Sequence, residues 1–180
     1  MYTKEELLEI NKERTISQIG FVVKDIKEAM DNMIELYGIG PWRVSTLSNE
    51  SVTEPKQKID GEYVDVEEPF KYYCALAQIG DMQFELIEPV YGENIYTEFM
   101  AKKGEGLHHF KEKISDESWD ETINNYKEKG IGITQSGFFG KARWAYLDTE
   151  DYNGIIYELG NSVYSNTPPK EGNIYFYPED

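Results

Sequence analysis

Apolar residues recur along residues 25–38 with the period of an amphipathic helix. A stripe of apolar side chains returns every three or four positions and consists of Ile26, Met30, Met33, Ile34 and Tyr37. This spacing predicts a helix with one buried face. Asp25 suits the N-cap, with Glu28 three residues later, and Gly38 suits the left-handed position just beyond the last turn.

A second helix is predicted by the same pattern further along the chain. Its apolar stripe consists of Trp119, Ile123 and Tyr126, with Asp116 as the expected N-cap and Gly130 as the expected end. These stripes are expected to lie in the core.

The flanks of the two helices match as well, so the sequence contains an internal repeat. Residues 16–40 and 107–132 each read as a short extended segment, an acidic residue, a helix and then Gly-Ile-Gly. Aligning the two copies places Gln18 on His109.

Three strand-like segments follow each predicted helix. The first copy offers PWRVSTL, YYCALAQIG and MQFELIEPV, and the second offers IGITQSGFF, ARWAYLDT and IIYELG. Runs of β-branched and aromatic residues between Gly, Pro, Asn and Asp are typical of strands. We therefore predict an α+β fold in which two tandem βαβββ modules form a curled mixed sheet around one concave site.

The predicted organisation has five segments. They are an N-terminal extension at 1–15, the first module at 16–92, a linker helix at 93–104, the second module at 105–163 and a C-terminal tail at 164–180. Within the first module, residues 48–69 are acidic and rich in helix and strand breakers, so we expect a long loop there. The prolines of the tail argue against a helix or a central strand, and its aromatic residues predict packing against another surface.

Composition limits the classes of partner. With 18 basic and 34 acidic residues the net charge is −16, which repels nucleic acid and anionic membrane and attracts cations. Solubility alone also explains such an excess of acids. No apolar run approaches the roughly 18 residues of a membrane span, no signal peptide is evident, and a single cysteine, Cys74, fits a reducing cytoplasm. We expect a cytoplasmic protein with a small-molecule substrate.

Four polar residues occupy matching positions in the two copies. Strand alternation turns Gln18 and His109 away from the helices, and Glu85 and Glu158 lie at corresponding places in the last strand of each module. One imidazole, two carboxylates and an amide oxygen form a reasonable ligand set for a divalent transition metal. Taken singly, each glutamate also fits a solvated edge or an ion pair, and His109 fits a structural histidine.

The order and spacing of several segments resemble the vicinal oxygen chelate superfamily, which includes glyoxalase I, methylmalonyl-CoA epimerase, extradiol dioxygenases and bleomycin-resistance proteins. The resemblance spans residues 16–161 and is closest to glyoxalase-like and epimerase-like members. It is carried by QIGFVVKDIKEAM, GIGPW, GDMQFELIEP, GEGLHHF, QSGFFG and LDTEDYNGIIYELG.

The resemblance implies which residues bind metal. His109 and Glu158 match the ligands of the second module, Glu85 matches a ligand of the first, and Gln18 stands where epimerase-like members usually have histidine. The ion would be Co, Ni, Mn, Zn or Fe, and Gln18 would favour looser binding, a harder ion or no metal. An iron dioxygenase needs two histidines, and alternation predicts that His108 faces away from the site.

The function that follows is a metal-dependent isomerase or epimerase, or a glyoxalase-type lyase, acting on a small oxyacid or thioester. Glu85 and Glu158 would be the catalytic acid and base. Lys111 is a candidate to bind a substrate carboxylate, with solvation as the alternative. Further candidates for the pocket wall are Trp42, Arg43 and Arg143, for each of which packing is the alternative.

Other interpretations remain open. Only Lys102 and Lys103 offer a basic cluster for the phosphates of a CoA thioester. An acidic chain with 14 tyrosines also suits a metal-free protein that binds a cationic or aromatic ligand, as in antibiotic resistance. Finally, the tail aromatics Tyr175, Phe176 and Tyr177 suggest a homodimer interface.

Overall fold

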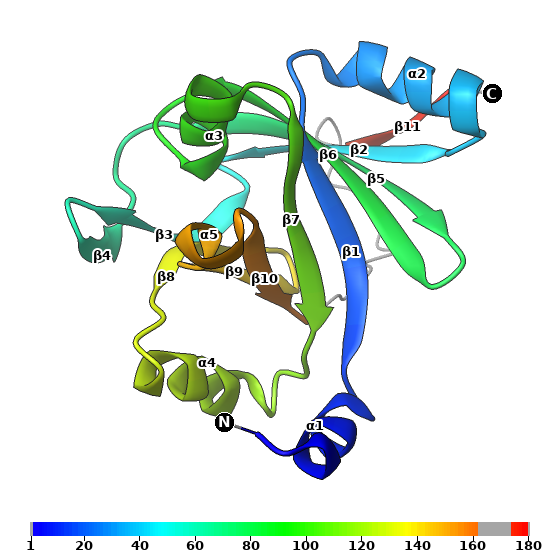
Figure 1. The fold of residues 1–180 in the computed structure, drawn as a ribbon. Helices are drawn as coiled ribbons and strands as arrows, with labels where there is room; N and C mark the ends of the chain where they lie inside the picture. The colour runs from blue at the N-terminus through cyan, green and yellow to red at the C-terminus, as the bar shows by residue number, and fades with distance from the viewer. Residues whose placement is uncertain (1, 162–173, 180) are drawn as a thin grey trace.

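The computed structural model describes residues 2–161 and 174–179, and these residues form one large, curled, mixed β-sheet with α2 and α4 packed on its outer faces (Figure 1). The N-terminal half contains α1 (Lys4–Asn11), β1 (Thr15–Val22), α2 (Ile26–Tyr37), β2 (Trp42–Ser48), β3 (Val52–Ile59), β4 (Glu62–Asp65), β5 (Lys71–Ile79), β6 (Met82–Tyr91) and α3 (Ile95–Lys103). The C-terminal half contains β7 (Gly106–Lys113), α4 (Trp119–Glu128), β8 (Ile133–Phe139), β9 (Ala142–Leu147), α5 (Glu150–Asn153), β10 (Ile156–Gly160) and β11 (Ile174–Tyr177).

The sheet confirms the predicted pair of βαβββ modules. Its strand order among the described residues is β11-β2-β5-β6-β1-β7-β10-β9-β8-β3-β4. The first strands of the modules, β1 and β7, pair antiparallel at the centre, and each pairs parallel with the last strand of its own module, β6 or β10. The α+β fold class is thus confirmed, whereas the module boundaries at 16–92 and 105–163 stay predictions. Residues 164–173 and 180 of the predicted tail lie outside the described residues.

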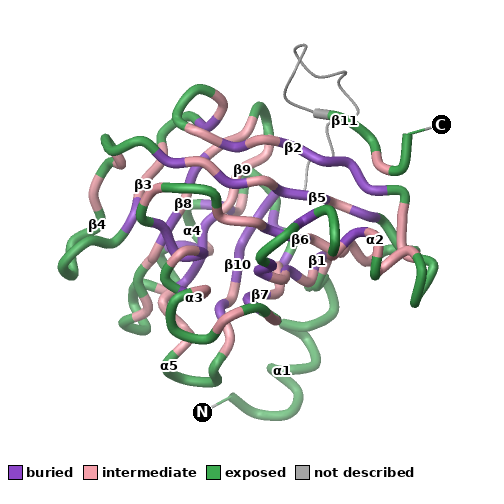
Figure 2. Tube along the Cα trace, turned by 90° about the horizontal axis from the view of Figure 1, so that it is seen from above, coloured by how far each residue is buried: buried purple, intermediate pink, exposed green. Residues whose placement is uncertain are grey.

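Three groups of buried apolar residues hold the fold together. One lies between α2 and the outer face of its module and contains Met30, Trp42 and Leu86, and a second lies under α4 and contains Trp119, Ile123 and Leu159. The third lies inside the curl and includes side chains of α3. Figure 2 shows that buried residues follow the strands, whereas α1 is exposed along its length.

The predicted ends of α2 are confirmed, but the predicted cap of α4 is wrong. The Asp25 side chain accepts a hydrogen bond from the backbone N–H of Glu28, and Gly38 has the left-handed φ of 68°. Helix α4 instead begins after Ser118, and the Asp116 carboxylate accepts a hydrogen bond from Nδ2 of Asn161. Asp116 therefore ties the end of β10 to the loop before α4.

The long loop predicted for residues 48–69 is also wrong, because this segment contains the hairpin β3–β4. Strand β3 leaves its own module and pairs with β8 of the other. Asp60 and Gly61 both have positive φ, 50° and 88°, as a tight two-residue hairpin turn requires. The Asp-Gly pair was a signal for this turn, but the exposed, charged composition of an edge hairpin obscured it.

The C-terminal segment adds an edge strand to the first module. Strand β11 pairs antiparallel with β2, and the Tyr177 ring packs against the core under α2. This agrees with a tail that packs on a surface without being a central strand. No helix among the described residues has the length and apolar character needed to cross a membrane.

A buried carboxylate–histidine cluster as candidate metal centre

A cavity of about 530 Å³ lies inside the curl of the sheet. Both modules contribute to its wall, with residues from β1, β2, β5, β6, α3, β7, β8, β9 and β10. The lining includes Glu85 of β6 and Glu158 of β10, and these strands flank the central β1–β7 pair. The predicted concave site is therefore present at the junction of the two modules.

Glu85 and Glu158 meet the buried His109 at the wall of this cavity. The Nε2 atom of His109 lies 3.0 Å from Oε2 of Glu85 and 3.0 Å from Oε2 of Glu158. His109 is fully buried and Glu158 is 2% exposed. Carboxylates are costly to bury unless a cation or donors compensate them, so this cluster requires positive charge at its centre.

The charges of the cluster shift its pKa values. Burial of the His109 imidazole disfavours its charged form, but attraction by the Glu158 and Glu85 carboxylates outweighs this and raises its pKa to about 9. Burial acts to raise the pKa of Glu85, yet hydrogen bonding and attraction to His109 dominate and leave that pKa lowered. Without a metal, an imidazolium supplies the central positive charge.

Gln18 contributes a fourth donor to the same wall. It is 1% exposed, and its Nε2 donates a hydrogen bond to Oε1 of Gln83 at 2.6 Å. Because the amide nitrogen is engaged, the amide carbonyl is the group left to face the cavity. Gln83 was not predicted, although its place opposite Gln18 follows from the pairing of β1 with β6.

In each of the four predicted ligands one buried atom forms no hydrogen bond with the described residues beyond the His109–carboxylate pairs. These atoms are Oε1 of Gln18, Oε2 of Glu85, Nε2 of His109 and Oε2 of Glu158. Donors about 2.1 Å from one ion and at right angles lie about 3.0 Å apart, as Nε2 of His109 and either carboxylate oxygen do. The donor set therefore fits a divalent metal ion.

The remaining oxygens of the two glutamates are held by neighbours. Oε1 of Glu85 accepts a hydrogen bond from the Cys74 thiol at 3.1 Å, and Oε1 of Glu158 lies 3.7 Å from the Lys111 ammonium. Burial raises the pKa of the Cys74 thiol well above its ordinary value, so it stays a neutral donor. Both carboxylates are thus oriented with Oε2 toward His109.

The ring of His109 lies over Gly20 of the neighbouring strand β1, where Gly20 is its register partner. A Cβ atom at position 20 would come within 2.0 Å of Cε1 and 2.3 Å of Nε2 of His109. Gly160 makes room for Lys111 in the same way, because a Cβ there would lie 2.7 Å from Cδ of the lysine. Neither glycine was singled out from the sequence, where only their position beside the ligand strands could have marked them.

Strands β1 and β7 each carry one extra residue where they pair. The register steps from Ile16 to Gln18 opposite consecutive residues of β7, and from His109 to Leu107 opposite consecutive residues of β1. Ser17 and His108 are therefore the bulge residues, and they are equivalent in the sequence repeat. A bulge re-aims the side chains beside it, so the same local irregularity precedes the predicted ligand in both modules.

The predicted orientation of His108 is wrong for this reason. Strict alternation would turn it to the opposite face from His109, but its Nδ1 lies 2.9 Å from Nδ1 of His109. His108 is buried among aromatic rings of α3 and β9, and it is not part of the Glu85–His109–Glu158 cluster.

The candidates for substrate contact have different locations. Lys111 borders the cavity, as does Arg43 of β2. Trp42 does not: as the neighbour of Arg43 on the strand it faces the other side and is fully buried under α2. Arg143 reaches the edge of the cavity, but its guanidinium carbon lies 3.9 Å from the ring centroid of Trp119, on the α4 side. Lys113 of β7 adds a basic residue to the wall.

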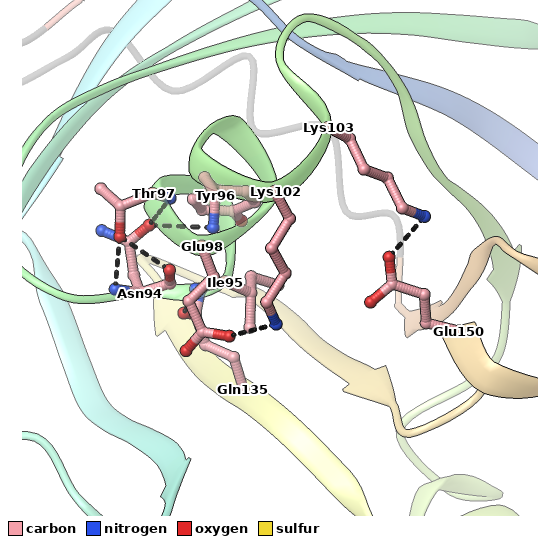
Figure 3. Close-up of polar contacts among 9 residues, drawn as sticks. All are labelled: Asn94, Ile95, Tyr96, Thr97, Glu98, Lys102, Lys103, Gln135 and Glu150. Atoms are coloured by element: carbon pink, nitrogen blue, oxygen red, sulfur yellow. Dashed lines mark hydrogen bonds and ion pairs between the residues drawn. The ribbon is translucent and has the colours of Figure 1, made fainter.

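Lys102 and Lys103, the basic pair considered for thioester phosphates, lie at the end of α3 and away from this wall. Figure 3 shows Lys102 paired with Glu98 of its own helix and Lys103 paired with Glu150 of α5. The start of α3 is fixed by Asn94, which caps Tyr96 and Thr97, and by Gln135 of β8, which accepts from the Ile95 N–H. These contacts join α3 to the second module.

Comparisons with known proteins agree with this architecture. The model of the Glyoxalase/Bleomycin resistance protein/Dioxygenase superfamily matches residues 17–146. The uncharacterized protein YqjC of Bacillus subtilis (strain 168) is 26% identical over 146 residues, which are 80% of this chain and 89% of that protein.

Solved structures of similar fold include the following two. The hypothetical protein BH1468 from Bacillus halodurans C-125 matches with a TM-score of 0.59 and 22% identity, over 83% of this chain and 94% of that one. A variant of Streptomyces coelicolor methylmalonyl-CoA epimerase in complex with 2-nitronate-propionyl-CoA matches with a TM-score of 0.60 and 22% identity, over 86% and 98% of the chains.

Proposed function

Because the chain belongs to the glyoxalase/bleomycin resistance protein/dioxygenase superfamily, we propose that it is a metal-dependent isomerase or epimerase, or a glyoxalase-type lyase. Its reaction moves a proton at the carbon next to a carbonyl group of a small oxyacid or thioester. The observation that carries the proposal is the convergence of Glu85, His109 and Glu158 on one buried point, with the buried Oε1 of Gln18 on the wall of the same cavity. The similar fold of a methylmalonyl-CoA epimerase supports the reaction class.

Gln18, Glu85, His109 and Glu158 would hold a divalent ion, for which Co, Ni, Mn, Zn and Fe are the candidates. When bound, such an ion polarises a carbonyl oxygen and makes the neighbouring C–H bond more acidic. Gly20 supports this role because it lets the His109 ring approach the centre of the cluster.

Glu85 and Glu158 are the residues that move the proton. One carboxylate takes the proton from the carbon, whose C–H electron pair stays on the substrate, and a carboxylic acid then returns a proton to re-form a C–H bond. Because the two glutamates come from strands on either side of the β1–β7 pair, removal by one and return by the other inverts the carbon. Removal and return by the same glutamate, at adjacent carbons, gives a glyoxalase-type rearrangement.

The wall of the cavity favours an anionic substrate. Besides the two glutamates of the cluster, its charged lining residues are the acidic Asp81 and the basic Arg43, Lys111, Lys113 and Arg143, although the whole chain carries an excess of acids. Lys111 is a basic residue in contact with the cluster, through its ion pair with Glu158, and it would bind a substrate carboxylate beside the reacting carbon.

A second candidate function is metal-free binding of an aromatic ligand. The aromatic part of the wall, formed by Tyr72, Tyr96, Phe139, Trp144 and Tyr146, favours it. The four basic residues of the wall oppose a cationic ligand, however. A chelator distinguishes the two candidates, because it abolishes the activity of the enzyme and leaves ligand binding by the metal-free protein unchanged.

The test is metal content by plasma mass spectrometry on protein purified without a metal-affinity column, beside His109→Ala. We expect near-stoichiometric metal in the wild type and its loss in the variant.

Deuterium exchange from D2O into the carbon next to the carbonyl of oxyacids and thioesters then tests the proton transfer. Glu158→Gln should abolish exchange, whereas Glu150→Gln, which alters the distant pair with Lys103, should not. Absence of metal after soaking would refute the proposal and favour the binding protein.

We further propose that the protein is a homodimer whose interface includes β11. Tyr175 and Phe176 are 50% and 58% exposed on this strand, which lies at the edge of the sheet, where unpaired backbone groups can join another copy. Phe176→Glu should halve the mass found by light scattering, whereas Tyr152→Glu on α5 should not. An unchanged mass for Phe176→Glu would exclude this interface.

A further inference from the structure

The two adjacent histidines contact each other through the same ring atom. Nδ1 of His108 lies 2.9 Å from Nδ1 of His109, and the rings are nearly perpendicular, at 88°. Neighbours on a regular strand point to opposite faces, so this contact exists because His108 is the extra residue of the bulge in β7. Bulges beside functional sites commonly re-aim a side chain.

The surroundings of His108 hold its ring in place. It is 1% exposed, and its ring centroid lies 5.0 Å from that of Phe99, 5.3 Å from Tyr96 and 5.8 Å from Tyr146. A charged imidazolium is costly to bury among such aromatic rings, which favours the neutral form of His108. A neutral imidazole has one protonated nitrogen and one acceptor nitrogen.

Two Nδ1 atoms at hydrogen-bond distance share one hydrogen. If His108 donates it, His109 must carry its own hydrogen on Nε2, the atom that faces Glu85 and Glu158. If His109 donates it, Nε2 keeps a lone pair for a metal ion. In metal sites the nitrogen of a ligand histidine that does not bind the ion usually donates to an acceptor, which fixes the ring and its tautomer.

We propose that His108 is a positioning residue, whose Nδ1 accepts the hydrogen bond of His109 Nδ1 and thereby leaves His109 Nε2 as the metal-binding atom. This inference rests on the metal site of the proposed function. His108 then has a role that is neither metal ligand nor substrate contact. Because of the bulge, the hydrogen-bond acceptor for His109 comes from the residue next to it in the sequence. The three aromatic neighbours keep water from competing for the hydrogen bond.

The test compares His108→Asn, His108→Gln and His108→Leu, loaded with Co²⁺ alone. The amide oxygen of Asn lies at about the distance of Nδ1 from the backbone, that of Gln lies one carbon further, and Leu has no acceptor. Titration gives the affinity for Co²⁺. Proton NMR of the cobalt protein gives the shifted, exchangeable N–H of the ligand imidazole, which a purely structural role of His108 would leave unchanged.

We expect the wild type and His108→Asn to bind Co²⁺ with similar affinity and to show the N–H signal. His108→Gln and His108→Leu should bind about 10–100-fold more weakly and lose the signal to exchange. If the Leu variant does not fold, the Asn and Gln variants decide. Unchanged affinity and signal in Gln would overturn this inference alone, whereas absence of Co²⁺ binding by the wild type would refute both it and the proposed metal site.

Discussion

The imidazole of His109 occupies the space that a side chain at Gly20 would fill: a Cβ atom there would lie 2.0 Å from Cε1 of His109. Gly20→Ala should therefore displace the ring from the two carboxylates and weaken metal binding by about 10–100-fold, because the ligand loses its orientation. The strain of overpacking should also lower the free energy of unfolding by about 1–3 kcal/mol. Metal titration and chemical denaturation measure the two effects.

Gly132→Ala is the matched control for this substitution. A Cβ at position 132 meets no atom within 4 Å, so metal affinity should be unchanged. Equal affinities for Gly20→Ala and the wild type would contradict the close approach of His109 to β1.

The raised pKa of His109 predicts how metal affinity and stability depend on pH. Since this pKa is about 9 in the folded protein and about 6.5 in an unfolded chain, His109 stabilises the metal-free fold fully below about pH 6.5, and this contribution is lost as pH rises through about 9. A metal ion must displace the same proton. Its affinity should therefore rise about tenfold per pH unit between about pH 6.5 and 9.

Calorimetric titration in two buffers of different ionisation enthalpy measures this exchange. About one proton should be released per bound ion at pH 7 and almost none at pH 10. An affinity that is constant over this range would mean that His109 is already neutral beside Glu85 and Glu158.

Arg14 and Glu112 form an ion pair that fastens the N-terminal segment to the second module. Two guanidinium nitrogens of Arg14 donate to the Glu112 carboxylate at 2.5 and 2.6 Å, and the Tyr157 hydroxyl donates to it at 2.7 Å. Glu112 is 6% exposed. Arg14→Ala leaves a buried carboxylate without its cation and should lower the free energy of unfolding by about 1–3 kcal/mol, less than a fully buried pair because Arg14 is partly solvated.

Urea denaturation of Arg14→Ala, Glu112→Gln and the double variant tests this coupling. The double variant should be more stable than the sum of the single effects predicts. Lys12→Ala, which breaks an exposed pair with Glu9, should change stability by no more than about 0.5 kcal/mol. Additive effects at Arg14 and Glu112 would show that the ion pair contributes nothing.

The sequence predicted those features that depend on periodicity within one segment. The stripe of α2, its cap at Asp25 and the matching places of Glu85 and Glu158 follow from spacing alone, and the repeat placed Gln18 and His109 on equivalent strands. The orientation of His108 could not be predicted in this way, because a bulge breaks the alternation by one residue. Trp42 and Arg43 are neighbours on β2, so only one of them can face the cavity. The sequence of β2 does not indicate which of the two does so.

The structure also depends on contacts between segments that no local pattern reveals. Strand β3 pairs with β8 of the other module, and the donors that orient the glutamates, Cys74 and Lys111, come from neighbouring strands. Their positions follow only once the register of β5 with β6 and of β7 with β10 is known.

Lys111 should have opposite effects on metal and on substrate. Its ammonium lies 3.7 Å from Oε1 of Glu158, so it repels a divalent ion near that glutamate and attracts an anion in the cavity. Lys111→Met should raise metal affinity by up to about tenfold. It should weaken binding of oxalate, a chelating dianion, to the metal-loaded protein by about 10–100-fold, because a charge-assisted hydrogen bond is lost.

Titrations with metal and then with oxalate separate these effects, and Lys103→Met is the control. Lys103 pairs with Glu150 outside the cavity, so its loss should alter neither affinity. If Lys111→Met weakens metal and oxalate together, Lys111 orders Glu158 and is not a substrate contact. If neither affinity changes, the side chain is solvated and the carboxylate of the substrate must bind elsewhere, with Arg43 as the next basic residue on the wall.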